Sequence, residues 1–163
     1  MIEIVNYSEA FASGVVDLIL PIQRTEFGFD IGVEDQPDLL SIASFYQTGA
    51  GGFWLALSQG EVVGTIALRD IGNNQGALRK MFVKDTHRGK EHSVAARLLE
   101  HLVQAATSAH VKELFLGTTE KFAAAHRFYE KSGFARVPPD TLPAAFPRMS
   151  LDTRFYRRAL SAG

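Results

Sequence analysis

The chain has 163 residues, of which 46% are hydrophobic and 21% charged, and this composition predicts one globular domain spanning residues 1–163. Its formal net charge of −1 argues against a nucleic-acid partner. Because it has no cysteine, disulfides, a thiol nucleophile and thiolate metal sites are excluded, and the cytoplasm is the expected location. No apolar run approaches the ~20 residues of a membrane span, and the start of the chain lacks the basic segment of a signal peptide, so we expect no membrane partner.

The first fifty residues predict a short strand followed by helices. Residues 2–6 have strand character, and residues 8–27 carry apolar positions at helical spacing. Pro21 interrupts this pattern and either kinks one helix or separates two. The stretch FGFDIGVEDQPD is typical of a loop, and DLLSIASFYQ after Pro37 predicts a second helix with an acid in its first turn.

The next stretch changes to a strand pattern. The runs FWLALS and VVGTIALRDI are β-rich and are separated by Gln59-Gly60-Glu61, which is a hairpin signal. A second turn, GNNQG at 72–76, leads into ALRKMFV. Three consecutive strands joined by such short turns must run antiparallel.

Residues 77–132 predict a strand–helix–strand–helix unit. A helix is expected from Ser93 to Ala109, a strand over 113–119 and a helix over 122–132, with Gly133 as a left-handed C-cap. This order implies a right-handed parallel crossover. An antiparallel meander that continues into a βαβα unit predicts the α/β class, with one mixed sheet and helices on its faces. The tail after residue 134 is expected to form strands interrupted by prolines.

The loop THRGKEHSV at 86–94 places the cations Arg88 and Lys90 where the predicted helix begins. A helix start exposes unpaired N–H groups and the positive end of the dipole, so cations there are repelled unless an anion binds. Loops between a strand and a helix are frequent ligand sites in such sheets, and Gly89 permits close backbone approach or a positive φ. The alternative is a solvated loop with a Ser93 N-cap. The motifs G-x-x-x-x-G-K-[ST] and G-x-G-x-x-G do not occur, so the usual nucleotide loops are absent.

The element order, this loop and the segment FYEKSGF at 128–134 together resemble the GCN5-related N-acetyltransferase (GNAT) superfamily over nearly the whole chain. The resemblance implies the GNAT-like acyl-CoA N-acyltransferase fold with splayed parallel strands, and an N-acetyltransferase that uses acetyl-CoA as co-substrate. In that family a loop of pattern [Q/R]-x-x-G-x-[G/A] holds the pyrophosphate of acetyl-CoA. The best match departs from this pattern twice, with Lys at its first position and Ser in place of Gly. It consists of Lys90, Glu91, His92, Ser93, Val94 and Ala95, preceded by Arg88 and Gly89.

The resemblance also implies contacts with the pantetheine arm in the gap between the splayed strands. These contacts should come from the main chain of Met81, Phe82 and Val83, and from Thr118 or Thr119 on the next strand. The alternative for Met81 and Val83 is plain core packing, and both interpretations can hold because the cofactor contacts use main-chain atoms.

Tyr129 occupies the position of the family's usual general acid. A phenol with an ordinary pKa of about 10 is protonated at neutral pH and can donate to a leaving thiolate. His126 is expected beside the cofactor. The alternative is that Phe122, His126 and Tyr129 form an aromatic stripe packed into the core.

The stretch from Thr25 to Leu68 contains no Lys, Arg or His, although acids recur along it. In the family this region builds the acceptor pocket, so the resemblance implies an amine acceptor, and the acids favour a cationic one. The alternative is a solvated acidic loop. The acids are Glu26, Asp30, Glu34, Asp35, Asp38 and Glu61.

Other features leave alternatives open. Glu26 and Asp70 are near the presumed substrate mouth, but neither is identified as the general base. The five histidines lack the i, i+4 spacing of a ligand pair, so no metal site is expected. A second hypothesis is a non-catalytic acyl-CoA-binding sensor. A cluster in the tail is expected to form an exposed strand edge or the rim of a homodimer, and it consists of Arg154, Arg157 and Arg158.

Overall fold

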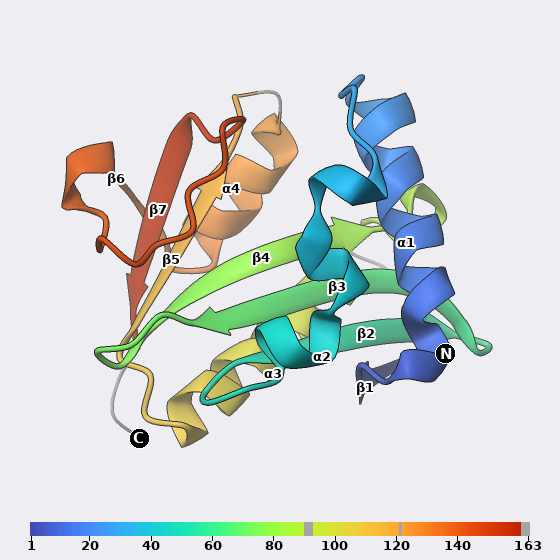
Figure 1. Ribbon diagram of the computed structural model, residues 1–163, viewed down its shortest axis with the longest axis horizontal. Coiled ribbons are helices and arrows are strands. Elements are labelled where there is room, and N and C mark those ends of the chain that lie inside the picture. The colour runs from blue at the N-terminus through green and yellow to red at the C-terminus, as the bar shows by residue number, and fades with distance from the viewer. Residues whose placement is uncertain (90–92, 121, 161–163) are drawn as a thin grey trace.

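A computed structural model describes residues 1–89, 93–120 and 122–160 of the protein, and within them seven strands form one sheet in the order β1-β2-β3-β4-β5-β7-β6 (Figure 1). The strands are β1 (Ile2–Asn6), β2 (Gly52–Ser58), β3 (Glu61–Asp70), β4 (Gln75–Val83), β5 (Glu113–Thr118), β6 (Ala135–Val137) and β7 (Arg154–Ala159). The longer helical segments are α1 (Ala12–Pro21), the π-helix η2 (Ile22–Glu26), α2 (Ile42–Tyr46), α3 (Val94–Ser108) and α4 (Ala123–Lys131). Short 3-10 turns are η1 (Glu9–Phe11), η3 (Val33–Asp35), η4 (Pro37–Leu40), η5 (Asp85–His87) and η6 (Pro139–Thr141).

The strand pairing confirms the predicted mixed sheet. Strands β1 to β4 form an antiparallel meander, and β4 pairs in parallel with β5. Helix α3 makes the crossover between them. Strand β7 then returns antiparallel to β5, and β6 pairs with β7 at the sheet edge.

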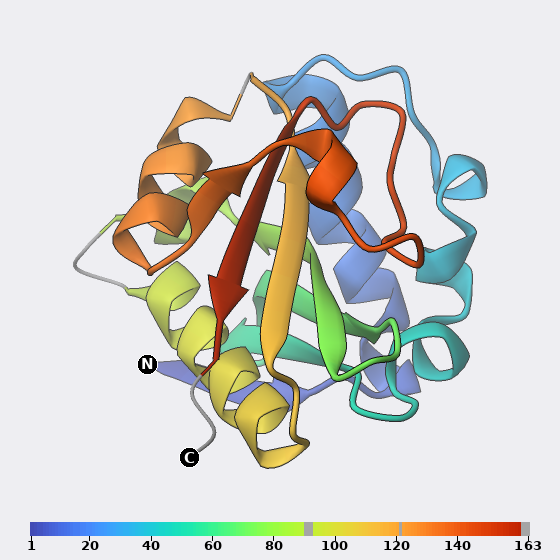
Figure 2. The same cartoon turned by 90° about the vertical axis from the view of Figure 1, so that its left-hand side faces the viewer.

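Helices cover both faces of the sheet. Figure 2 shows α3 and α4 on one side and α1 on the other. Helices α1 and α2 bury Val15, Ile19 and Ile42 against one face, and α3 buries Leu98 and Leu102 against the other. Strands β2 and β3 are consequently buried along nearly their whole length, as strands covered on both faces are. Since each fully buried side chain of this size contributes roughly 1.5–3 kcal/mol, the central strands are a rigid base for the site.

Strands β4 and β5 separate after a short paired segment. Their parallel ladder runs only from Gln75↔Glu113 to Ala77↔Phe115. Beyond it the two strands continue without pairing, and Figure 1 shows them diverging. The main-chain groups on this side of β4 therefore have no neighbouring strand, which leaves donors and acceptors for a ligand. The splay implied by the family resemblance is present.

The structure refines several local expectations and confirms others. The α-helix α1 ends at Pro21, and the chain continues without a break into the wider turns of η2, in which the Phe27 N–H donates to the Ile22 carbonyl at 3.2 Å. The segment DLLSIASFYQ divides at Ser41 into η4 and α2. The tail forms strands only at β6 and β7, since the prolines between them remove strand donors. Gly133 has φ +91, which confirms the left-handed C-cap.

Candidate acyl-CoA and acceptor site

A cavity of about 580 Å³ opens where β4 and β5 separate. Its walls come from η2 and the loop after it, the second half of β4, the end of β5, the start of α4 and the loop before β7. It lies toward the carboxyl ends of the two parallel strands, which is the usual ligand position in open α/β sheets. The fold therefore brings distant segments of the chain together at the place where β4 has no strand partner.

The residues expected to meet the pantetheine arm all line this cavity. Met81, Phe82 and Val83 line it from β4, and Thr118 and Thr119 line it from the end of β5. The two groups face one gap from opposite sides of the splay. The structure thus brings together these residues, which the chain separates by more than thirty positions.

The predicted pyrophosphate loop borders the same cavity. Arg88, Gly89 and Ala95 line it, and Gly89 has φ +106, a conformation that favours glycine. Val94 is buried in the core, and Ser93 precedes α3 in a left-handed conformation without a side-chain capping hydrogen bond. The first turn of α3 therefore lies beside the cavity, as an anion site requires. Three of the predicted loop residues lie outside the described residues, namely Lys90, Glu91 and His92.

Arg88 already has an anionic partner. Its guanidinium forms a bidentate ion pair with Glu26, with Nη1–Oε1 at 2.7 Å and Nη2–Oε2 at 3.1 Å. Its Nε also donates to the Val83 carbonyl at 2.8 Å. The Arg88 and Glu26 side chains are 41% and 33% exposed, so the pair contributes at most about 1 kcal/mol to folding. A phosphate can replace the carboxylate at little cost to stability.

Tyr129 lines the cavity from α4, and only 6% of the residue is exposed. Its ring packs against Phe128, Phe134 and Tyr156. Burial raises the pKa of its hydroxyl above the ordinary value, so the phenol is protonated at neutral pH. The hydroxyl forms no hydrogen bond with another described residue. Since no fully buried side-chain oxygen of these residues lacks a partner, this oxygen is accessible from the cavity and can donate to a ligand.

His126 lies on another side of α4 and does not line the cavity. Its Nε2 lies 2.7 Å from the Thr119 carbonyl, and its Nδ1 lies 3.1 Å from Nη1 of Arg154. A carbonyl only accepts and a guanidinium only donates, so this geometry assigns the neutral Nε2–H tautomer. His126 thereby ties α4 to β5 and β7. The structure gives no support to the expected cofactor contact, and the proposed aromatic stripe divides, since Phe122 and Tyr129 face the cavity.

A bulge in β4 directs two neighbouring cations to the same side of the sheet. Lys80 has φ +54, and the β3–β4 register shifts at this point. The Arg79 guanidinium lies 5.9 Å from the centroid of the Tyr46 ring, and Lys80 Nζ lies 2.7 Å from Oε1 of Gln36. Both cationic residues line the cavity. Without the bulge, strand alternation places neighbouring side chains on opposite faces.

The positive charge of Lys80 is balanced by a buried carboxylate. It is buried, and its Nζ lies 3.4 Å from Oδ2 of Asp38, which also accepts a hydrogen bond of 2.5 Å from the Tyr46 hydroxyl. Burial lowers the pKa of Lys80, and the Asp38 charge opposes this shift. Gln36 completes the network by exchanging two hydrogen bonds with Gln23. Among the described cationic residues that line the cavity, Lys80 and Arg88 have ion-pair partners and Arg79 has none.

Asp152, in the turn before β7, also lines the cavity. Its Oδ2 accepts a hydrogen bond of 3.1 Å from the Met149 main chain. It also lies close to β5, because a Cβ placed on Gly117 would come within 2.6 Å of that oxygen. Burial raises the pKa of the Asp152 carboxyl, against the opposing effects of the Met149 hydrogen bond and the positive charges of Arg79, Arg148 and Lys80. An acidic group thus lies where β5 turns away from β4.

Several acids of the cation-poor stretch have partners inside the protein. Glu26 and Asp38 form the ion pairs described above, and Glu61 pairs with Lys84 at 2.6 Å. Asp35 accepts a main-chain hydrogen bond of 3.0 Å within its own turn. These interactions satisfy much of the negative charge on which the expectation of a cationic acceptor depends.

The two candidate bases differ in position. Glu26 lines the cavity, but both of its oxygens are bound to Arg88. Asp70 accepts hydrogen bonds from the main chain of Ala50 and Gly72, and it does not line the cavity. These hydrogen bonds lower the pKa of Asp70, which makes it a weaker base. Asp70 therefore has a structural role.

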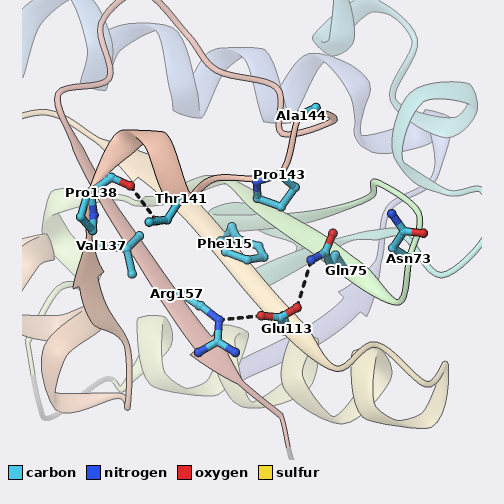
Figure 3. A pocket seen from close by; sticks show the side chains of 10 residues that line it. All are labelled: Asn73, Gln75, Glu113, Phe115, Val137, Pro138, Thr141, Pro143, Ala144 and Arg157. Carbon is cyan, nitrogen blue, oxygen red and sulfur yellow. Dashed lines mark hydrogen bonds and ion pairs between the residues drawn. The ribbon is translucent and has the colours of Figure 1, made fainter.

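A second cavity, of about 520 Å³, lies at the opposite end of β5 (Figure 3). Its polar side chains satisfy one another, since Glu113 accepts hydrogen bonds from Gln75 at 3.0 Å and from Arg157 at 2.6 Å. Gln75 and Glu113 are the first residues of β4 and β5. This cavity therefore lies at the amino ends of the parallel strands, away from the splay, and we assign no site to it.

Comparison with known proteins identifies the family. The family model described as "Acetyltransferase (GNAT) family" matches residues 16–134. The chain belongs to the GNAT family. Among curated relatives, N-acetylaspartate synthetase of Xenopus tropicalis is 32% identical over 132 residues, a match that covers 76% of this chain and 48% of that protein. The chain spans about half the length of the curated relatives it matches.

Solved structures confirm the GNAT fold. The acetyltransferase of the GNAT family from Staphylococcus aureus Mu50 superposes with a TM-score of 0.94 at 36% identity, covering 99% of this chain and 100% of that one. The PaiA N-acetyltransferase from Thermoplasma acidophilum, solved in complex with coenzyme A, superposes with a TM-score of 0.74, covering 98% of this chain and 99% of that one. At 16% identity, the second match shows a shared fold alone.

The described residues contain neither a metal-binding cluster nor a membrane-spanning helix. Within residues 1–89, 93–120 and 122–160, no group of three or more His, Cys, Asp or Glu side chains is arranged to hold a metal ion. None of the described helices combines the length and the apolarity needed to span a bilayer.

Sequence reasoning missed Arg79, Lys80 and Asp152 as residues of the GNAT cavity. The Arg-Lys pair in ALRKMFV matches an ordinary exposed strand, and only the positive φ of Lys80 brings both side chains to one face. Asp152 stands in a proline-rich tail that has no periodic pattern. No local signal in the sequence predicts that it returns to β5.

Proposed function

We propose that this GNAT protein is an N-acetyltransferase that transfers the acetyl group of acetyl-CoA to a primary amine of a small molecule or peptide by direct attack. The observation that carries the proposal is the cavity in the β4/β5 splay, with the protonated Tyr129 on its wall and the start of α3 beside it. The GNAT membership of the chain supports the same activity.

The cavity residues suit acetyl-CoA, which supplies an activated thioester. The unpaired edge of β4 at Met81, Phe82 and Val83 offers main-chain donors and acceptors to the pantetheine amides. The first turn of α3 and the guanidinium of Arg88 suit the pyrophosphate, with Arg88 exchanging the Glu26 carboxylate for phosphate oxygens.

The chain's own part in the chemistry is to orient the amine and to move protons. The amine nitrogen bonds to the acetyl carbon as the carbon–sulfur bond breaks, and the Tyr129 hydroxyl donates its proton to the leaving sulfur. An acceptor that enters as an ammonium loses two protons. One replaces the proton that Tyr129 gave, and the other passes to solvent, so the products are an amide, a thiol and one proton.

Thermal shift and thiol release together test this function. Acetyl-CoA at 100 times its Kd should add about 2.7 kcal/mol to the free energy of unfolding, whereas NAD and ATP should add little. A panel of primary amines should then release coenzyme A thiol. Stabilisation by acetyl-CoA without thiol release from any amine supports the alternative, a non-catalytic acyl-CoA-binding sensor. No stabilisation at millimolar acetyl-CoA rejects the cofactor site itself.

A further inference from the structure

We propose that the acceptor is a free amino acid, whose carboxylate binds the Arg79 guanidinium and whose ammonium group binds the Asp152 carboxylate. The inference rests on the proposed acetyltransferase function and names its second substrate.

The first observation is that Arg79 has no anionic partner. It is half-buried in the cavity wall, and no described residue forms an ion pair or a hydrogen bond with its side chain. Its guanidinium carbon lies 5.7 Å from the Phe45 ring and 5.9 Å from the Tyr46 ring. Contact with these rings orients the guanidinium while its N–H groups stay unpaired. Such a planar group matches a carboxylate through two parallel hydrogen bonds.

The second observation is the arrangement of charge in the cavity wall. Lys80 pairs with Asp38 and Arg88 pairs with Glu26, which leaves Arg79 and Asp152 as the positive and the negative group without an ion pair among the described residues that line the cavity. These two face the same cavity, and their charges influence each other without forming an ion pair. A wall with one cation and one anion held apart is complementary to a zwitterion. In an α-amino acid, covalent geometry separates the nitrogen from the carboxylate carbon by roughly 2.5 Å.

The third observation concerns the position of Asp152. Its carboxylate lies against Gly117 at the end of β5, so an ammonium bound to it lies at the splay. Asp152 can take one proton from the bound ammonium, which leaves a neutral nitrogen with the lone pair needed to form the bond to the acetyl carbon. Asp152 later releases this proton to solvent. The raised pKa of the Asp152 carboxyl favours the transfer.

Matched acceptors test the inference. The standard free amino acids are screened by thiol release, and the best one is compared with its primary amide, with the amine that lacks the carboxyl group, and with a dipeptide that begins with the same residue. In wild type we expect kcat/KM for the free amino acid to exceed that for each analogue by about 10- to 100-fold. Arg79→Gln should lower the value for the free amino acid by a similar factor, through KM, and change the value for the amide by less than about threefold.

Control variants separate carboxylate recognition from folding and from long-range charge. Arg136→Gln removes an exposed arginine of β6 that pairs with Glu120 at 3.7 Å and does not line the cavity, so it should leave the preference intact. Arg79→Lys retains the charge and loses the planar group, and it should fall between wild type and Arg79→Gln. If Arg79→Gln does not fold, as judged by thermal melting, Arg79→Lys carries the comparison.

Calorimetry with coenzyme A-saturated protein separates failure of the inference from failure of the proposed function. A free amino acid should bind to wild type and bind more weakly to Arg79→Gln. If amines without a carboxylate are acetylated as well as the amino acid, the transferase stands and the inference falls. If an amino acid binds with the expected Arg79 dependence but no thiol is released, the binding site stands and catalysis is rejected. If Arg79→Gln lowers kcat/KM equally for the free amino acid and its amide, or if no amino acid binds to wild type, the inference is overturned.

Discussion

Replacing Tyr129 by Phe removes one oxygen atom from the cavity wall and retains the packing of the ring. The ring centroids of Phe128, Phe134 and Tyr156 lie 5.6, 5.7 and 6.1 Å from that of Tyr129, and these contacts do not involve the hydroxyl. Because the hydroxyl has no hydrogen-bond partner among the described residues, we expect the free energy of unfolding to change by less than about 1 kcal/mol. The Kd for acetyl-CoA should also change little, since the proposed function places the phosphates at the loop before α3, away from the Tyr129 hydroxyl.

The loss of activity in Tyr129→Phe should appear in kcat. Proton donation to the departing sulfur matters only as the carbon–sulfur bond breaks, so it stabilises the transition state and not the bound substrate. General acid catalysis typically supplies about 10²–10⁴-fold, and with water as a substitute acid we expect a loss of at least about tenfold. Because burial raises the pKa of Tyr129 above its ordinary value, the phenol stays protonated, and the deficit should be uniform between about pH 6 and pH 9.

Thiol release under single-turnover conditions measures the chemical step directly. Tyr156→Phe is a matched control, because the Tyr156 hydroxyl donates to Glu130 at 2.7 Å, accepts from Arg154 at 3.3 Å and does not line the cavity. This control should lower the free energy of unfolding by about 1–2 kcal/mol and leave the single-turnover rate of the folded protein near wild type. A near-wild-type single-turnover rate for Tyr129→Phe shows that the phenol only packs, and it refutes the assignment.

The remaining predictions concern charged residues around the cavity. Arg88→Ala should raise the KM for acetyl-CoA and change the free energy of unfolding by less than about 1 kcal/mol, because its pair with Glu26 is partly exposed; an unchanged KM excludes a phosphate contact. Lys80→Met leaves the Asp38 carboxylate buried without its counter-charge, so denaturant titration should show a loss of about 3–5 kcal/mol in the free energy of unfolding. The Lys80→Met/Asp38→Asn double variant should recover much of this loss. Full stability of the single variant contradicts the buried pair. The pKa of Asp152 is raised by burial, so its contribution to stability is present below the unfolded pKa of about 3.9 and is lost as the pH rises through the folded pKa. Asp152→Asn should therefore raise the melting temperature at about pH 7 and not at about pH 3, and a lower melting temperature at pH 7 rejects this interpretation.

The cofactor side of the site is largely predictable because its signals are local. The loop at 86–94 and the segment FYEKSGF each occupy a few consecutive residues, and their roles depend on where a strand ends and a helix begins. The positions predicted to line the splay, Met81, Phe82, Val83 and Thr118, follow once β4 and β5 are recognised as neighbouring parallel strands. The roles of these residues toward acetyl-CoA stay predictions that the experiments above test.

The long-range contacts around the site were not predictable from local pattern. The Arg88–Glu26 pair joins residues 62 positions apart, and the Lys80–Gln36 hydrogen bond joins residues 44 positions apart. The direction of His126 depends on Arg154 in a strand that follows it by 28 positions. Residue spacing on a helix placed His126 on the face of Tyr129, but the nearest donors and acceptors in the folded chain decide which way the ring points.

By itself, then, the sequence determined the order and type of most elements of this protein, because hydrophobic periodicity and turn chemistry act over a few residues. Only the tertiary structure decided the bulge at Lys80, the partner of Arg88, the unpaired state of Arg79 and the return of Asp152 to β5. These features depend on strand register and on which charges the fold brings within a few ångströms of one another. The strength of an ion pair or a hydrogen bond depends on the distance between its groups in space, and this distance cannot be read from their separation along the chain.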